Sequence, residues 1–169
     1  MATASVPTVD RATGTWILVV VLVVAHFVLH VGFGIGRGAP DLLTIGLLVA
    51  ARELSLGAAA VVGLAFGLLE DALSVLAFGA NTVTMTAIGI AGAFTRDLFV
   101  GDSRFFVVSY LFAGKWMRDF LHWLMMGSEL RQPFFSEVIL EGSLAAAYAA
   151  AVGVALFGLG LLGRGGEEA

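Results

Sequence analysis

The residues with the most chemical potential lie within one otherwise apolar stretch, Phe105–Gly127: Lys115, Arg118, Asp119 and His122. Lys115 and Asp119 are four residues apart, as are Arg118 and His122, so a helix places all four on one face and lets the first pair bond. Three charges at mid-membrane cost about 8–10 kcal/mol, and a dozen apolar neighbours recover only about 4–7 kcal/mol. This face must therefore turn toward other helices, a wet cavity or a partner.

Arg118 then needs a carboxylate from another helix, because Asp119 is taken by Lys115. We predict that it pairs with Asp71 or Glu141, since a guanidinium favours bidentate carboxylate contacts. If the chain folds as a bundle of helices across a membrane, residue counts place several polar groups at one depth, on the side away from the cytoplasm. His26 and His30 are among them. The predicted polar cluster comprises Glu70, Asp71, Asn81, Lys115, Arg118, Asp119, His122 and Glu141. A buried ion network that fixes helix order, a small-ligand pocket and a partner-contact site all remain open.

Enzyme and metal-site interpretations are weaker. Asp71 and Asp119 could form an aspartyl pair like that of lipoprotein signal peptidases, but the motifs around those aspartates are absent. His26, His30 and Glu70 are metal-ligand types with usable spacing. Two histidines four apart within a span more often donate to neighbouring helices, however. We predict no catalytic residue, no metal and no cofactor.

The composition indicates a membrane protein. Of 169 residues, 59% are hydrophobic and 13% charged, with a mean hydropathy of +0.98, whereas about a quarter of residues are charged in soluble domains. The absence of cysteine excludes thiolate chemistry, and a net charge of −4 without a basic patch excludes nucleic-acid binding. The sequence predicts an all-α polytopic protein, a compact bundle of about six transmembrane helices, one of them short.

The expected arrangement is a single transmembrane domain over residues 16–162, with tails at 1–15 and 163–169. Pro40–Ala51 is too short for a span of about 20 residues and must be shielded by its neighbours. The six expected segments are Trp16–Gly34, Pro40–Ala51, Leu54–Leu73, Asn81–Phe99, Phe105–Gly127 and Glu137–Leu162.

Arginine distribution predicts that both termini are cytoplasmic. With the amino terminus inside, five arginines lie on the cytoplasmic side: Arg11, Arg52, Arg96, Arg104 and Arg164. Only Arg37 and Arg131 lie on the other side.

Small residues form two ladders at helical spacing, Gly63 with Gly67, and Gly142 with Ala146 and Ala150. Such ladders let helix backbones approach closely in lipid. They could serve internal packing or receive the helix of a partner.

Residues Gly63–Ser74, with glycines four apart followed by Asp71 and Ser74, precede a glycine turn at Phe78–Thr82. This region resembles the third-to-fourth span region of the rod shape-determining protein MreD family. The upstream Pro40–Leu43, opening a short second span, is also similar to that family. The resemblance covers roughly residues 40–96; Glu70 and the charged face of Phe105–Gly127 do not match its pattern.

The resemblance implies a non-enzymatic scaffold subunit of the bacterial cell-elongation machinery in the cytoplasmic membrane. The implied partners are the single-span protein MreC, the SEDS polymerase with its class B penicillin-binding protein and, indirectly, MreB filaments. MreD-like proteins look similar in span arrangement to the substrate-binding subunits of energy-coupling-factor transporters. A small-solute (vitamin-type) binding subunit is therefore the alternative function.

Overall fold

A computed structural model describes residues 11–32, 40–74, 78–95 and 104–162, and every regular element in these ranges is helical. This confirms the all-α class. The helices are α1 (Arg11–Phe27), α2 (Leu42–Ala51), α3 (Leu56–Leu73), α4 (Ala80–Thr95), α5 (Arg104–Met125) and α6 (Gly142–Gly158). A π-helical turn, Val28–Gly32, extends α1, and another, Phe135–Glu141, leads into α6.

Each of the six expected segments overlaps one helix, with shifted ends. The helix α1 begins at Arg11, so the last residues of the predicted amino-terminal tail are helical. The predicted tail 163–169, the end of the fourth segment beyond Thr95, and Arg37, Arg96 and Arg164 lie outside the described residues.

Three of the described helical stretches are long and apolar enough to cross a membrane: Ala12–His30, Leu56–Leu73 and Phe135–Gly158. The helix α5 is also long, at 22 residues, but carries four charged side chains. The helices α2 and α4 have 10 and 16 residues. The membrane character expected from composition is therefore supported by helix length and apolarity.

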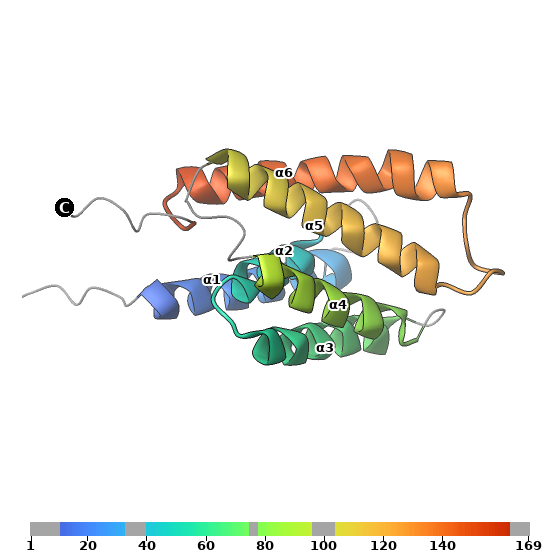
Figure 1. The fold of residues 1–169 in the computed structure, drawn as a ribbon, viewed down its shortest axis with the longest axis horizontal. Helices are drawn as coiled ribbons and strands as arrows, with labels where there is room; N and C mark the ends of the chain where they lie inside the picture. Colours follow the sequence, from blue (N-terminus) through green and yellow to red (C-terminus); the bar gives the residue numbers. More distant parts are fainter. Residues whose placement is uncertain (1–10, 33–39, 75–77, 96–103, 163–169) are drawn as a thin grey trace, which may run out of the picture.

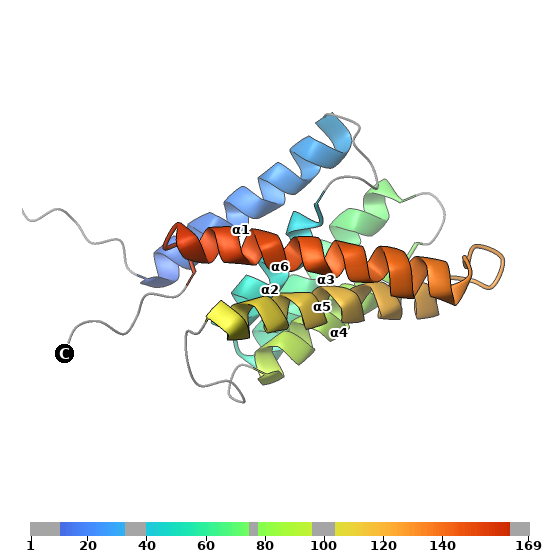
Figure 2. The same ribbon diagram turned by 90° about the horizontal axis from the view of Figure 1, so that it is seen from above.

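The short helix α2 lies at the centre of the bundle (Figure 1). It contacts the other five helices, with α3 and α4 paired on one side and α5 and α6 paired on the other. Figure 2 shows α1 diverging from α6 along its length. All ten residues of α2 are buried, with Leu43, Ile45 and Leu47 fully enclosed. The prediction of a short, shielded helix is confirmed.

Asp41 explains why α2 begins where it does. Its carboxylate accepts hydrogen bonds from the Thr44 backbone N–H (3.0 Å) and the Thr44 hydroxyl (2.7 Å), which caps the first turn. The preceding Pro40 has no N–H to leave unsatisfied. Because the helix starts inside the bundle, Asp41 also lies inside it, with a side chain only 13% exposed.

The α3–α4 hairpin is packed backbone to backbone. A Cβ atom on Gly63 would lie 2.3 Å from the Met85 carbonyl oxygen, and one on Gly67 would lie 2.4 Å from the Thr82 Cα. Gly89 of α4 approaches the Ala59 carbonyl in the same way. The first ladder thus serves internal packing and is closed to a partner's helix.

The second ladder is internal as well. Gly142, Ala146 and Ala150 are buried, and α6 packs against α5. A Cβ on Gly142 would lie 3.7 Å from the Asp119 Cβ. The faces left for partners or lipid are instead lined by large apolar side chains, such as Val20 on α1 and Val61 on α3, which are 58% and 65% exposed.

Candidate functional site

Arg118 on α5 is the centre of a buried group of ionisable side chains. Its Nη2 donates to Glu70 Oε2 of α3 at 2.7 Å and to Asn81 Oδ1 of α4 at 2.9 Å. Its Nη1 donates to Asp119 Oδ1 at 3.3 Å. One side chain thereby joins α3, α4 and α5. The charged face of α5 turns inward, as its insertion cost requires.

The predicted partner of Arg118 was wrong by one residue. We expected Asp71 or Glu141, but Glu70 is the carboxylate that the guanidinium contacts, and Glu141 is exposed. Asp71 belongs to the buried stripe Ala59–Gly63–Gly67–Asp71 that faces α4. Glu70, one residue earlier, is rotated about 100° around the helix, toward α5.

Lys115 connects Asp119 with Asp41. Its ammonium donates to Asp119 Oδ1, which confirms the predicted pair on α5, and lies 3.4 Å from Asp41 Oδ2. Arg118 Nε is 3.8 Å from the same Asp41 oxygen and has no hydrogen-bond partner. Lys115 is 5% exposed, so its interactions with these carboxylates offset the free-energy cost of removing the ammonium group from water.

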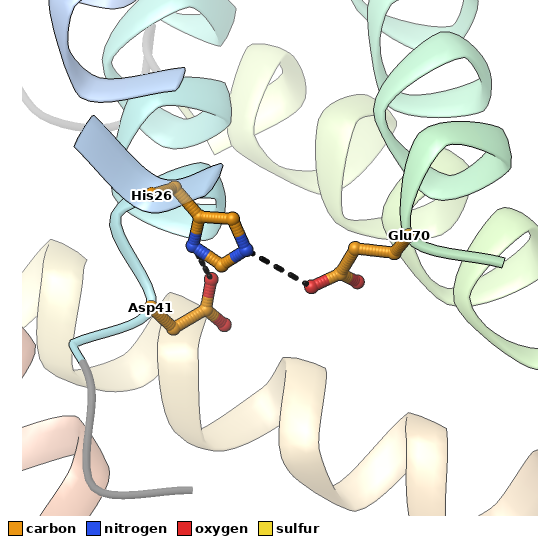
Figure 3. Close-up of side chains that lie close together, drawn as sticks. All are labelled: His26, Asp41 and Glu70. Atoms are coloured by element: carbon orange, nitrogen blue, oxygen red, sulfur yellow. Dashed lines mark ion pairs between the residues drawn. The ribbon is translucent and has the colours of Figure 1, made fainter. Parts of the chain in front are cut away.

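His26 on α1 lies between two carboxylates (Figure 3). Its Nδ1 is 3.9 Å from Asp41 Oδ1, and its Nε2 is 3.9 Å from Glu70 Oε1. The ring is 4% exposed, and Nδ1 accepts a long contact of 3.4 Å from the Leu43 N–H. His30 takes no part here: its ring stacks on His26, and its Nδ1 lies 3.0 Å from the His26 carbonyl oxygen.

We refer to this group as the ion network. It consists of His26, Asp41, Glu70, Asn81, Lys115, Arg118 and Asp119. Three carboxylates face two cations, so the network carries one negative charge when His26 is neutral. Buried charges are tolerated only when they are paired and hydrogen-bonded. The network meets that condition for most of its atoms but leaves Glu70 Oε1 without a hydrogen-bond donor among the described residues.

Asp71 is satisfied separately, by the start of α4. Its carboxylate accepts from the backbone N–H groups of Gly79 (2.9 Å), Asn81 (3.2 Å) and Thr82 (2.9 Å), and from the Thr82 hydroxyl. These amides open a helix and would otherwise lack partners. An acidic group there also faces the positive end of the helix dipole. Asp71 therefore caps the start of α4. The cap lies within the region that resembles the MreD family, residues 63–82.

The structure brings most of the predicted cluster together. Glu70, Asn81, Lys115, Arg118 and Asp119 meet in the ion network, whereas Asp71 forms the neighbouring cap. His122 is half-buried, and its Nδ1 has no hydrogen-bond partner. No hydrogen bond or ion pair joins Asp71 to Asp119 among the described residues, and each is engaged elsewhere.

Sequence reasoning did not assign Asp41 to the cluster. The signal was present, because a helix of about 15 Å cannot cover a hydrocarbon core of about 30 Å. The residue that caps such a helix is therefore held at depth. The metal set weighed from the sequence was His26, His30 and Glu70, and no metal was predicted. In the structure, ligand-type atoms of His26 and Glu70 lie close to Asp41.

The network offers two kinds of chemistry. Its paired charges tie α2, α3, α4 and α5 together, and His26, Asp41 and Glu70 place ligand-type atoms within 4.8 Å of one another. The chain matches no protein-family model, and no curated protein or solved structure is significantly similar to it.

Proposed function

We propose that this chain is a non-enzymatic scaffold subunit of the bacterial cell-elongation machinery, of the MreD kind. On this proposal it crosses the cytoplasmic membrane six times, with both termini in the cytoplasm. It binds an MreC-type single-span protein and the cell-wall synthases, a SEDS polymerase and a class B penicillin-binding protein, through its outer helix faces. MreB filaments are then reached indirectly.

The observation that carries the proposal is the α3–α4 hairpin. The residues of the family-like run do not scatter in the fold. Gly63 and Gly67 set the helix contact, and Asp71 caps α4 through Gly79, Asn81 and Thr82. The run therefore corresponds to one structural unit, as expected if it specifies a shared architecture.

The ion network supports a scaffold role. Its cations are paired with carboxylates of the same chain, and Arg118 alone connects three helices. Breaking such a buried pair costs about 3–5 kcal/mol, so the network opposes helix rearrangement. A framework held in this way can present fixed apolar faces to partner helices.

The test is affinity purification of the tagged full-length chain from its own membranes in mild detergent, followed by mass spectrometry of proteins and small molecules. We expect an MreC-type protein and the synthase pair to be enriched over an unrelated multi-pass control. Their absence, with only the tagged chain recovered, would refute the proposal.

Tryptophan variants of exposed residues identify the helix face that contacts the partner. Tryptophan at Val61 and Leu68 tests the outer face of α3, and tryptophan at Val20 and Val24 tests that of α1; all four side chains are exposed. Loss of partner recovery with one pair and retention with the other identifies the docking helix. Retention with both would direct the search to Leu144 on α6, which is 72% exposed.

The alternative is a subunit that binds a small solute. The observation favouring it is the convergence of buried polar side chains around His26 and Glu70, since solute sites in membranes use convergent polar groups. The same purification separates the two functions: a stoichiometric organic molecule without protein partners supports the solute binder.

A further inference from the structure

We propose that His26, Asp41 and Glu70 bind one divalent transition-metal ion of the zinc type. These residues come from α1, the cap of α2, and α3, and their ligand-type atoms lie within 4.8 Å of one another (Figure 3). This inference does not rest on the scaffold proposal. It concerns a site that would be occupied whatever the chain assembles with.

The distances suit an ion with modest side-chain adjustment. Zinc is bound tetrahedrally at about 2.0–2.2 Å by imidazole nitrogen and carboxylate oxygen, so two ligands on one ion stand about 3.4 Å apart. The 3.9 Å between His26 Nε2 and Glu70 Oε1 is longer than that spacing by about 0.5 Å, which the two side chains must close when the ion binds. It is also too long for a direct hydrogen bond. Asp41 Oδ1 now lies 3.9 Å from His26 Nδ1, so the Asp41 carboxylate must turn toward the Nε2 side of the ring to complete the set.

Two of the three proposed ligand atoms, Glu70 Oε1 and His26 Nε2, have no hydrogen bond with a described residue. Glu70 uses Oε2 for Arg118, and its Oε1 faces His26. His26 is 4% exposed, and its Nε2 has no hydrogen bond with a described residue. Among the described residues, Asp41 Oδ1 accepts a hydrogen bond from the Thr44 N–H alone, and a carboxylate oxygen has two lone pairs.

Metal binding at Nε2 requires the ring proton to sit on Nδ1. The Leu43 N–H now points at Nδ1, but at 3.4 Å this contact is longer than an ordinary hydrogen bond. The change of tautomer therefore costs little free energy, because it breaks only this long contact with the Leu43 N–H.

The net charge of the ion network favours binding of a cation between His26, Asp41 and Glu70. Three carboxylates against two cations leave the ion network with one negative charge when His26 is neutral. Lys115 and Arg118 bind the far oxygens, Asp41 Oδ2 and Glu70 Oε2, so the near oxygens remain for the ion. A mixed nitrogen and oxygen set suits Zn²⁺ or Mn²⁺ better than Mg²⁺, which prefers oxygen and retains water.

The experiment measures zinc uptake by the full chain in lipid nanodiscs after chelator treatment. Competition with a fluorescent zinc chelator should give one ion per chain, with Mn²⁺ binding more weakly and Mg²⁺ not competing. His26→Gln and Glu70→Gln should each weaken zinc affinity about 10–100-fold or more. Zinc should also raise the thermal transition of the wild type, and not that of His26→Gln.

His30→Gln is the matched control, because His30 is the same residue type one turn further along the chain and stacks on His26. It should keep zinc affinity within about threefold. Gel filtration checks that each variant folds. If Glu70→Gln does not fold, the zinc-dependent thermal shifts of the wild type and of His30→Gln decide the matter. Absence of zinc uptake by the wild type, unchanged affinity in His26→Gln, or equal loss in His30→Gln would overturn the proposal.

Discussion

Glu70 and Asp71 are adjacent in sequence but are stabilised in different ways. Asp71 accepts hydrogen bonds from residues 8 to 11 positions further along, all at the start of α4. Glu70 pairs with Arg118, 48 positions away on α5. The first carboxylate is satisfied by uncharged donors within one hairpin, and the second needs a cation that arrives from another part of the fold.

The difference shows that a buried carboxylate can be either a local or a global constraint. The α3–α4 hairpin contains its own glycine contacts and its own cap, so it is close to self-sufficient. The ion network is complete only when α1, α2, α3, α4 and α5 have all assembled. Damage to the hairpin should therefore act locally, whereas damage to the network should loosen the whole bundle.

The largest effect is expected from Arg118→Leu. Glu70 would lose its cation while remaining buried, and Asp41 would keep only Lys115, which together cost about 3–5 kcal/mol of unfolding free energy. Arg104→Leu, at the start of the same helix, removes an exposed side chain whose guanidinium lies 5.7 Å from the Phe157 ring. That control should cost less than about 1 kcal/mol. Denaturant titration in mixed micelles measures both, and equal losses would mean that the network contributes no special stability.

Gly67→Ala should disrupt the hairpin next most strongly, by about 3 kcal/mol. The added Cβ would meet backbone atoms of α4, which cannot move aside as a side chain can. Gly57→Ala on the same helix has no atom within 4 Å of its new Cβ and should change stability by less than about 0.5 kcal/mol. Circular dichroism and thermal unfolding compare the two, and a neutral Gly67→Ala would contradict the close packing.

A double-mutant cycle sharpens the contrast between the two carboxylates. Glu70→Gln and Arg118→Leu should couple by about 2 kcal/mol, because each removes the other's partner. Asp71→Asn and Arg118→Leu should couple by less than about 1 kcal/mol. Coupling of the same size in both cycles would show that the cap and the network are one unit.

The smallest expected effect is that of Thr82→Val. It removes the hydroxyl that donates to Asp71 but leaves the three backbone donors, so the loss should be about 1.5 kcal/mol. Thr86→Val, one turn later, only removes a bond to the Thr82 carbonyl and should be within about 0.5 kcal/mol of the wild type. The same denaturant titration measures both, and a larger loss for Thr86→Val would contradict this interpretation of the cap.

Much of the architecture could be predicted from the sequence because it follows from hydropathy and helical spacing. The helical segments, the shielded α2 and the Lys115–Asp119 pair all depend on local patterns. The inward face of α5 followed from the cost of its charges. Glu70 as the partner of Arg118 was missed, although the four-residue spacing of Gly63, Gly67 and Asp71 already placed Asp71 toward the neighbouring glycine-packed helix.

What the sequence could not provide was the pairing between distant elements. Which helix lies beside α5 depends on how six elements pack, and Asp41 was assigned only to the opening of the short second segment, next to Pro40. The small-residue ladders posed the same difficulty. Spacing predicts close approach of two backbones, but it does not say whether the second backbone belongs to the same chain.

The enclosed position of α2 has a consequence for biogenesis. A ten-residue helix capped by a carboxylate has no stable place in lipid by itself, so its final position depends on α5, which is synthesised later. The chain has no cysteine, so Ile45→Cys is a unique reporter of that step. It should react with a water-soluble maleimide in truncations that end before residue 104 and be protected in the full chain. During synthesis, α2 should therefore reach its final position only after α5 has been made, although α2 forms the centre of the bundle.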